Sequence, residues 1–409
     1  MQNINSGDTA FILIAAALVM FMTPGLALFY GGMVRSKNVL GTIMQSIIIL
    51  GIINVLWMLF GYSLAFGPDK LGLIGDLSWV GFKGVGLAPN AEYAPTLPHE
   101  AFMIFQGMFA IITPALITGA FAERMKFSSF LAFTIAWFII VYLPVAHWVW
   151  GAGGWLRNLG VLDFAGGIVV HASSGAAALA AAIFTGKRKG FGTEPLIPHN
   201  IPLTIIGMGI LWFGWFGFNA GSALAAGGLA ANAFATTQVA ATAATASWVI
   251  TEWIKGGKPT TLGAATGAIA GLATITPAAG FVGPLAALLI GLIAGIVCYY
   301  AISLKFKLGY DDSLDVVGVH GVGGVLGTLS VGIFASTAIN SAAKDGLIFG
   351  NASLLQIQAL GVFTVAIFSF IASMVILKVI NALIGVRIAD EDELTGLDLS
   401  QHSEVGYDF

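Results

Sequence analysis

The chain has 409 residues, of which 57% are hydrophobic and only 9% are charged, and its formal net charge is −3. A soluble globular domain carries about 25% charged residues, so this composition excludes a water-soluble globular fold. The single cysteine, Cys298, excludes an intrachain disulfide framework. We expect a protein whose surroundings are a lipid bilayer, with no nucleic acid as a partner.

Apolar runs separated by charged or Gly/Pro-rich breaks recur along the whole chain. One helical crossing needs about 20 apolar residues, and strand-length alternation is absent, so the pattern predicts an all-α polytopic membrane protein. No basic residue precedes the first run, so we expect no cleavable signal peptide in Met1 to Asp8. The eleven predicted transmembrane helices lie approximately at 8–30, 40–66, 100–121, 127–148, 165–185, 202–219, 230–254, 262–276, 281–304, 316–334 and 354–383.

Lysine and arginine are unevenly distributed between the two sets of loops. If the first short loop is cytoplasmic, all of the 17 lie on the inner side except Lys70, Lys83, Arg157 and Lys344. Inner loops of membrane proteins carry the excess of positive charge, which predicts that the N-terminus is outside and the C-terminus is cytoplasmic. The Gly- and Pro-rich segment 67–99 then becomes an ordered outer loop.

Two short patterns recur at equivalent positions of the predicted helices. A Thr-Pro pair occurs at 113–114 in the third helix and at 276–277 in the eighth. An aspartate also precedes a histidine by eight residues twice, as Asp163 with His171 and as Asp312 with His320. Because five helices is an odd number, a second copy of the block enters the membrane from the opposite face, and such repeats meet at a site near the midplane.

The repeats define the predicted domain organisation. Repeat one covers about 8–185, repeat two covers about 202–334, and a long eleventh helix at about 354–383 completes a membrane domain over 1–385. The remaining segment, 386–409, begins with an acidic cluster at 390–393 and is otherwise polar. We interpret it as a cytoplasmic regulatory tail.

His171 and His320 differ from the other four histidines because each lies several residues inside an apolar run. An ionisable side chain at membrane depth is costly and usually faces a cavity or a partner. If a pseudo-two-fold axis relates the repeats, the two imidazoles converge halfway across the bilayer. We interpret them as a functional pair, and the alternative is a buried pair that only holds two helices together.

Metal binding is the weaker interpretation of this pair. A catalytic zinc usually has three protein ligands, and the sequence offers no third ligand at membrane depth, so we expect neither metal nor other cofactor. A neutral imidazole pair instead presents hydrogen-bond donors and acceptors to a small polar solute. Histidine also titrates near neutral pH, so a proton relay stays open.

Asp163 is predicted to act locally. Eight residues of helix extend about 12 Å, so Asp163 is not a direct partner of His171. We predict that it N-caps the fifth helix near the outer mouth. The cap alone, and the cap combined with attraction of a cation, are both compatible with the sequence.

Aromatic side chains are predicted to gather at the outer ends of the third, fourth and sixth helices. Phe105 and Phe109 share a helix face, as do Phe218 and Ser222, and Trp150 follows the fourth helix at the same level. Singly, such residues are usually packing residues or interface anchors. Together they form a candidate cage in which a small cation gains about 0.5–2 kcal/mol from the rings.

These segments closely resemble the ammonium transporter (Amt/Mep/Rh) family, in particular its bacterial and archaeal Amt branch. The matching segments follow the family order along nearly the entire chain. They are TPG at 23–25, FYGG at 29–32, FQGMF at 105–109, GAFAER at 119–124, AHWVWG at 146–151, LDFAGG at 162–167 running on to His171, GWFGFNAGS at 214–222, TP at 276–277, and Asp315 with GVHG at 318–321.

The resemblance implies roles for individual residues. It implies a homotrimer with one pore per subunit and an N-terminus outside. Its implied outer ammonium site is Trp150, Ser222 and Phe109 with Phe105 nearby, its stacked gate is Phe109 with Phe218, its twin-histidine pore centre is His171 with His320, its essential outer carboxylate is Asp163, and a further pore-mouth residue is Thr276.

The resemblance also implies control by trimeric PII nitrogen-regulatory proteins that dock on the cytoplasmic face and touch the tail. The family pattern usually has glycine after the histidine and alanine before the tyrosine of the tail. Here these positions are Ser403, after His402, and Gly406, before Tyr407, which departs from the pattern.

We therefore expect ammonium transport across the cell (plasma or inner) membrane by a non-enzymatic protein. NH4+ is recruited at the outer aromatic site and deprotonated, and NH3 passes the twin histidines while the proton is carried separately. Methylammonium is a candidate second substrate. The alternatives are an ammonium sensor acting through the tail and a PII-type partner, and an intramembrane enzyme that uses the histidine pair with a metal.

Overall fold

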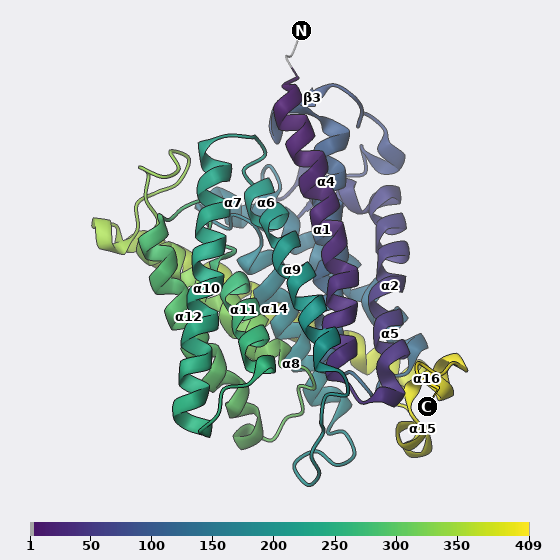
Figure 1. Cartoon of the computed structure of the whole chain (residues 1–409). Helices are drawn as coiled ribbons and strands as arrows, with labels where there is room; N and C mark the ends of the chain where they lie inside the picture. Colours follow the sequence, from purple (N-terminus) through teal and green to yellow (C-terminus); the bar gives the residue numbers. More distant parts are fainter. Residues whose placement is uncertain (1–3, 409) are drawn as a thin grey trace.

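The structure, a computed structural model, describes residues 4–408 and consists mainly of long helices running side by side (Figure 1). The start of α1 and the C-terminal helices α15 and α16 lie at opposite ends of this bundle, as an odd number of crossings requires (Figure 1). The predicted membrane domain and tail together extend from residue 1 to residue 409. Residues 1–3 and 409, including the start of the segment Met1 to Asp8, lie outside the described part.

The first five crossings lie within the segment predicted as the first repeat, about 8–185. Four of them combine α-helix with short 3-10 or π-helical turns. They are α1 (Ser6–Met33); η1 (Ser36–Asn38), α2 (Val39–Leu56), η2 (Trp57–Gly61) and α3 (Tyr62–Phe66); α4 (His99–Ile117) with η4 (Thr118–Ala120); α5 (Phe127–Trp137), η5 (Phe138–Tyr142) and α6 (Leu143–Trp150), followed by the short α7 (Trp155–Leu159); and η6 (Gly167–Ala172) with α8 (Ser173–Thr185).

The second block of five crossings is followed by one long helix. The predicted helix 281–304 begins later, at Pro284, because proline is well suited to the first helical position. These crossings are α9 (Ile201–Gly221), α10 (Gly228–Gly256), α11 (Thr261–Ile275), α12 (Pro284–Leu308), η7 (Val317–Gly321) with α13 (Val322–Phe334), and α14 (Ala352–Ile384).

Nine of these eleven crossings in the described chain are long and apolar enough by themselves to span a membrane. The other two are α10, which is rich in alanine and threonine, and α11, which has 15 residues. Both pack against other helices, and nearly all of α11 is buried. Contact with protein rather than with lipid explains the weaker hydrophobic signal of α11. In α10 the signal is weakened by alanine and threonine, although Phe234, Ile250 and Trp253 remain exposed along the helix. The prediction of an eleven-helix membrane protein is confirmed.

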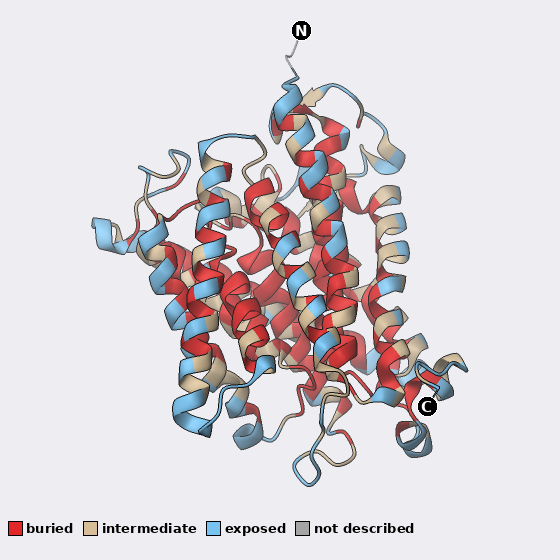
Figure 2. Ribbon diagram, in the orientation of Figure 1, coloured by how far each residue is buried: buried red, intermediate tan, exposed pale blue. Residues whose placement is uncertain are grey.

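The outside of the bundle is apolar along the helices. On α14 the exposed residues Leu360, Phe363, Ile367 and Ile371 recur at helical spacing, and Figure 2 shows such exposed positions alternating with a buried interior. A soluble protein does not expose stripes of this kind over most of its helices, whereas lipid accepts them.

The outer loop 67–99 is ordered, as predicted, and contains two short antiparallel hairpins. The first pairs β1 (Asp69–Lys70) with β2 (Ile74–Gly75), and the second pairs β3 (Pro89–Asn90) with β4 (Ala94–Pro98). Between them lies the 3-10 turn η3 (Val80–Phe82), and a further turn, η8 (Leu347–Phe349), lies in the outer loop before α14.

The first helices of the two repeats, α1 and α9, pack closely along their length. A Cβ atom added at Gly207 would lie 2.3 Å from the backbone nitrogen of Phe29 and 2.6 Å from the carbonyl oxygen of Gly25. Only glycine permits this approach, which is the usual way that helices associate inside a membrane. The halves of the molecule are thus joined through backbone contact.

Buried charges join the two repeats at the end of the bundle where the C-terminal tail lies. The carboxylate of Glu123, which is 1% exposed, lies 3.1 Å from the guanidinium groups of Arg35 and Arg188. Arg188 also pairs with Asp311 of the second repeat at 2.9 Å. Burial alone would raise the pKa of Glu123, but Arg188 and Arg35 hold that pKa below its usual value. The two halves are therefore linked electrostatically as well as by packing.

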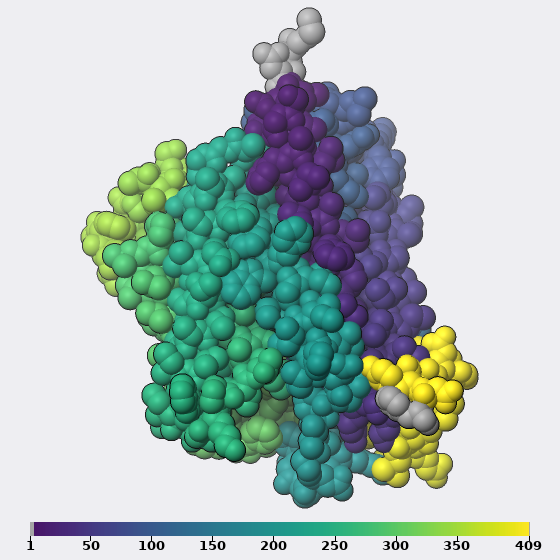
Figure 3. Space-filling view, viewed as in Figure 1, coloured from purple at the N-terminus to yellow at the C-terminus, as the bar shows by residue number. Residues whose placement is uncertain are grey.

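The C-terminal tail forms two short helices, α15 (Asp390–Thr395) and α16 (Leu397–His402). Of these, α16 lies against the start of α2 and α15 packs on α16, so the tail adjoins the beginning of the second crossing (Figure 3). The two carboxylate oxygens of Asp398 accept hydrogen bonds from the backbone nitrogens of Leu40 at 3.0 Å and Gly41 at 2.8 Å. Those nitrogens belong to the first turn of α2, which has no partner within its own helix for them. The tail thus caps a membrane helix.

The two departures from the family pattern in the tail have structural consequences. Ser403 adopts a left-handed conformation with φ of 54°, which glycine reaches more easily than serine. Gly406 packs so closely that an added Cβ would lie 2.6 Å from Cγ1 of Val39. The tail therefore docks with one strained residue and one close backbone contact.

Candidate functional site

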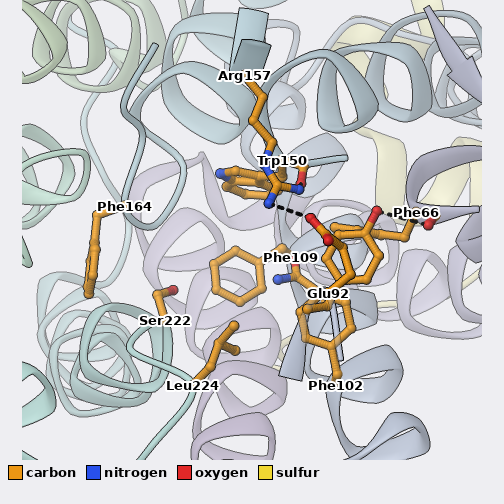
Figure 4. A pocket seen from close by; sticks show the side chains of 11 residues that line it. Phe66, Glu92, Phe102, Phe109, Trp150, Arg157, Phe164, Ser222 and Leu224 are labelled. Atoms are coloured by element: carbon orange, nitrogen blue, oxygen red, sulfur yellow. Dashed lines mark hydrogen bonds and ion pairs between the residues drawn. The ribbon is translucent and has the colours of Figure 1, made fainter. Parts of the chain in front are cut away.

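An outer cavity of about 180 Å³ opens at the level of α6, α7 and the outer loop (Figure 4). Three of the predicted outer-site residues, Phe109, Trp150 and Ser222, line it. The complete lining is Phe66, Glu92, Tyr93, Phe102, Gln106, Phe109, Trp150, Arg157, Phe164, Ser222 and Leu224. Phe105 is absent from the cavity surface, because it is fully buried behind Phe109 with ring centroids 5.0 Å apart.

The rings of this cavity are arranged to present π-faces. The ring of Phe109 meets that of Trp150 edge to face at 5.9 Å and 87°. The indole nitrogen of Trp150 donates to the carbonyl oxygen of Asp163 at 2.9 Å, so it is not available to a ligand. The hydroxyl of Ser222 donates to the carbonyl oxygen of Phe218 at 2.9 Å, which leaves its oxygen free to accept. A small cation with N–H groups is the ligand that suits these groups.

Two phenyl rings close the floor of the outer cavity. The centroids of Phe109 and Phe218 lie 4.3 Å apart, and both side chains are buried. Below these two rings lies the imidazole of His171, whose centroid is 6.1 Å from that of Phe218. The sequence-predicted gate residues are therefore brought together directly above the predicted pore centre.

His171 and His320 converge, as predicted from the repeats. Their Nδ1 atoms lie 3.2 Å apart and their rings are nearly parallel, with centroids at 5.2 Å. Each histidine belongs to a π-helical turn, η6 or η7, at the start of its crossing. The two segments come together at a glycine pair, since a Cβ added at Gly175 would lie 2.1 Å from the Cα of Gly321.

The cavity around the histidines is small and mostly apolar. A cavity of about 10 Å³ touches both imidazoles and is otherwise lined by apolar and aromatic side chains. One water molecule needs roughly 10–15 Å³, so a hydrated ion does not fit there. The lining is Met22, Leu26, Phe29, Ile112, Leu116, Val170, His171, Leu211, Trp215, Phe218, Ile269 and His320.

Asp163 N-caps the fifth crossing, which confirms that part of the prediction. Its two carboxylate oxygens accept hydrogen bonds from the backbone nitrogens of Gly166, Gly167, Ile168 and Val169, at 2.6–3.1 Å. All four unpaired donors of the helix start are thereby satisfied. Since its backbone also holds Trp150, Asp163 positions both the outer cage and the histidine helix.

Thr276 lies deeper than the mouth of the outer cavity. It is fully buried, and its hydroxyl accepts a hydrogen bond from the indole nitrogen of Trp215 at 2.9 Å. The indole of Trp215 in turn stacks on the ring of His171 with centroids 5.5 Å apart. Thr276 therefore contacts the predicted pore centre through Trp215, a residue to which the sequence assigned no separate role.

Other residues missed from the sequence line the outer cavity. Gln106 follows Phe105 in an apolar helix, and its Oε1 atom is buried without a hydrogen-bond partner among the described residues. Its polarity within that helix was a signal that could have identified it. Glu92, Tyr93 and Arg157 come from loops, where sequence spacing gave no signal. In the same described part of the chain, no group of three or more His, Cys, Asp or Glu residues could hold a metal ion.

Comparison with known proteins identifies the family. Residues 10–407 match the model of the Ammonium Transporter Family. The chain belongs to the ammonium transporter family. It is 54% identical over 402 residues to an ammonium transporter of Bacillus subtilis (strain 168), covering 98% of each chain. It is a multi-pass membrane transport protein and not an enzyme.

An archaeal relative and relatives of known structure also match this ammonium transporter family member over nearly its whole length. Amt1 of Archaeoglobus fulgidus is 49% identical over 406 residues, covering 98% of this chain and 100% of the relative. The crystal structure of Saccharomyces cerevisiae Mep2 superposes with a TM-score of 0.90 at 36% identity, covering 95% of this chain and 89% of Mep2. A structure named as a sensor Amt protein gives a TM-score of 0.89 at 32% identity, covering 97% and 98%.

Proposed function

We propose that this transporter binds NH4+ in the outer cavity and conducts it as NH3 past His171 and His320. The observation that carries the proposal is the passage itself, in which an aromatic cage suited to a cation stands above an apolar constriction of about 10 Å³. Even after relaxation, moving a monovalent cation into such surroundings costs several kcal/mol. A cage gains only about 0.5–2 kcal/mol from cation–π contacts, so the ion is held outside and not carried through.

Deprotonation removes the charge, and with it the cost of entering the apolar constriction. NH4+ gives up one proton near Phe109 and Phe218, and the uncharged NH3 continues along the imidazole edges. K+ has no proton to lose and no N–H groups to donate, so it is rejected. The proton travels separately, and the histidine pair is the candidate relay because its two Nδ1 atoms lie within hydrogen-bond distance of each other.

Each group that lines the outer cavity has its own role in binding NH4+. Phe109 and Trp150 supply π-faces, Ser222 supplies an acceptor, and the unpartnered Oε1 of Gln106 adds a second acceptor. Phe109 with Phe218 acts as the gate. Asp163 and Thr276 support the site, Asp163 through the cap and Trp150, and Thr276 through Trp215. Methylammonium fits the same chemistry and serves as a tracer.

The distribution of charge and the family resemblance support a membrane location, an orientation and partners for the protein. We place it in the plasma membrane with the N-terminus outside and the C-terminus in the cytoplasm, which accords with the excess of basic residues on the tail side. The family resemblance supports a homotrimer with one pore per subunit. It also supports a PII-type partner at the cytoplasmic face, where the docked tail offers a surface.

The test is simultaneous measurement of ammonia flux and electrical current in proteoliposomes. Wild type is expected to conduct ammonium and exclude K+, His320→Ala and His171→Ala to conduct less or to lose NH4+/K+ selectivity, and Phe218→Ala to admit K+. His402→Asn, in the tail, is the matched control and should behave as wild type. Unchanged methylammonium uptake with intact K+ exclusion in both pore-histidine variants contradicts the mechanism.

A sensor function is the second candidate. It is favoured by the similarity to the structure named as a sensor Amt protein and by the tail, which is bonded to the start of α2. A sensor would bind ammonium in the same outer cavity and report its occupancy through the tail to a partner. Flux in liposomes separates the two, because a pure sensor carries none.

A further inference from the structure

The rim of the outer cavity holds a positive charge where a cation is expected to bind. Among the described residues that line this cavity, Arg157 and Glu92 are the charged ones. Arg157 belongs to α7 and Glu92 to the outer loop between β3 and β4, so two separate segments bring them together. In Figure 4 the guanidinium extends past Trp150 toward the carboxylate of Glu92.

Arg157 is fixed in this place by three contacts. Its Nη2 atom lies 2.9 Å from Oε1 of Glu92, and its Nη1 atom donates to the carbonyl oxygen of Trp150 at 3.2 Å. Its guanidinium carbon lies 5.9 Å from the ring centroid of Tyr93. The tether to Trp150 ties the position of this charge to the aromatic cage itself.

Glu92 is the group that balances this charge. Burial raises the pKa of Tyr93 to about 12, so its hydroxyl is neutral and supplies no counter-charge. The side chains of Arg157 and Glu92 are 37% and 56% exposed, so their pairing adds little to the stability of the fold. The electrostatic potential that an incoming cation meets nevertheless depends on whether both charges are present.

Resting on the proposed recruitment of NH4+ in this cavity, we propose that Glu92 sets the apparent affinity for ammonium by neutralising Arg157 at the rim. Without Glu92, an uncompensated positive charge stands beside the cage and repels the substrate cation. Without Arg157, the rim becomes negative and attracts it. Neither residue takes part in deprotonation or passage, so the effect falls on KM and leaves the maximal flux unchanged.

The test is methylammonium uptake into proteoliposomes by wild type, Glu92→Gln, Arg157→Gln and the double variant. Glutamine at position 92 keeps an oxygen for the guanidinium, so the loop stays attached while one charge is lost. Glu92→Gln is expected to raise KM roughly threefold to tenfold. This is the effect on binding that one partly screened charge has from about a few ångströms away. Arg157→Gln is expected to give a KM no higher than wild type, and the double variant a KM within about twofold of wild type.

Two controls separate local charge from other causes. Asp76→Asn removes a negative charge from the same outer loop at a residue that does not line the cavity, and it should retain the wild-type KM. The Glu92→Gln effect should also shrink as ionic strength rises, because salt screens exposed charges.

Several results would overturn the inference. These are a wild-type KM for Glu92→Gln, a raised KM for Arg157→Gln, a double variant as impaired as Glu92→Gln, or an equal effect of Asp76→Asn. Failure of the proposed function looks different, because wild type itself would then show no saturable flux. If wild type saturates and the Glu92→Gln curve superimposes on it, only the role of Glu92 is wrong.

Discussion

His171 and His320 face each other through Nδ1 atoms 3.2 Å apart, although 149 residues separate them along the chain. A neutral imidazole carries one N–H, so one Nδ1 donates and the other accepts. The Nε2 atom of His171 is buried without a hydrogen-bond partner among the described residues. It is therefore free to form a hydrogen bond, and the contact between the Nδ1 atoms couples the two rings.

Because the two rings share one bond, their substitutions should not add. We expect His171→Ala and His320→Ala each to lower ammonium flux roughly tenfold, since orphaning a buried polar group costs about 1–3 kcal/mol. The ammonium flux of the double variant should be only slightly lower than that of the less active single variant. Flux assays on the three variants measure this coupling, and multiplicative losses would show that the imidazoles act independently.

Asp163 and Asp312 occupy equivalent places in the two repeats but are bonded differently. Asp163 accepts four backbone hydrogen bonds, whereas Oδ2 of Asp312 accepts one from Val317 at 2.7 Å and its buried Oδ1 has no partner in the described chain. Replacement by asparagine turns one acceptor oxygen into a donor. Asp163→Asn should therefore cost several kcal/mol, at about 1.5–3 kcal/mol for each bond to a charged group, and greatly reduce flux.

Asp312→Asn is the matched comparison, and it should remain folded and active. Thermal unfolding in detergent and flux in liposomes measure both variants. Equal losses for the two substitutions would mean that the number of backbone bonds does not determine the role of these aspartates.

Asp312 should also make stability depend on pH. Burial raises the pKa of Asp312 to about 6, with Lys305 opposing this and Asp315 adding to it. A carboxyl with a pKa near 3.9 when unfolded and near 6 when folded binds its proton more tightly in the fold, so stability falls as pH rises from about 4 to about 6. Asparagine mimics the protonated form and removes this loss, which amounts to roughly 3 kcal/mol.

The measurement is the difference in Tm between Asp312→Asn and wild type across this pH range. Other titrating groups are common to both proteins and cancel. The difference should move in favour of the variant up to about pH 6 and then level off. A difference that stays constant with pH would rule out a raised pKa at this position.

Two tail residues should shift docking in opposite directions. Asp398→Ala removes both bonds to the start of α2 and should release the tail. Ser403→Gly relieves a left-handed conformation that costs a non-glycine residue about 1 kcal/mol, so docking should tighten roughly fivefold. Limited trypsin cleavage after Arg387, where the tail leaves the membrane domain, should speed up in the first variant and slow in the second. Equal rates in all three proteins would contradict the docked arrangement.

Much of the fold could be predicted because lipid imposes a simple rule on the sequence. Runs of about 20 apolar residues identify crossings, and nine of the eleven in the described chain satisfy that rule. The observed ends of α10 and α11 lie within two residues of the predicted 230–254 and 262–276, although neither helix satisfies the rule by itself. The cap by Asp163 was predictable as well, because a helix start and its capping residue are neighbours in sequence.

The site was predicted less completely. Spacing on a single helix placed Phe105 beside Phe109 but could not show that Phe105 lies behind the cavity. Trp215 gave no signal, because its importance comes from stacking on His171 and bonding to Thr276, which lie on other crossings. Glu92 and Arg157 meet only because the outer loop folds back over the mouth.

The sequence by itself determined that this protein spans a membrane eleven times and that two equivalent histidines lie at membrane depth, because hydrophobic length and repeat spacing are properties of the chain. Only the tertiary structure decided which side chains reach the passage. That choice depends on backbone contacts between distant glycines, such as Gly175 with Gly321, and on loops whose positions no local preference fixes.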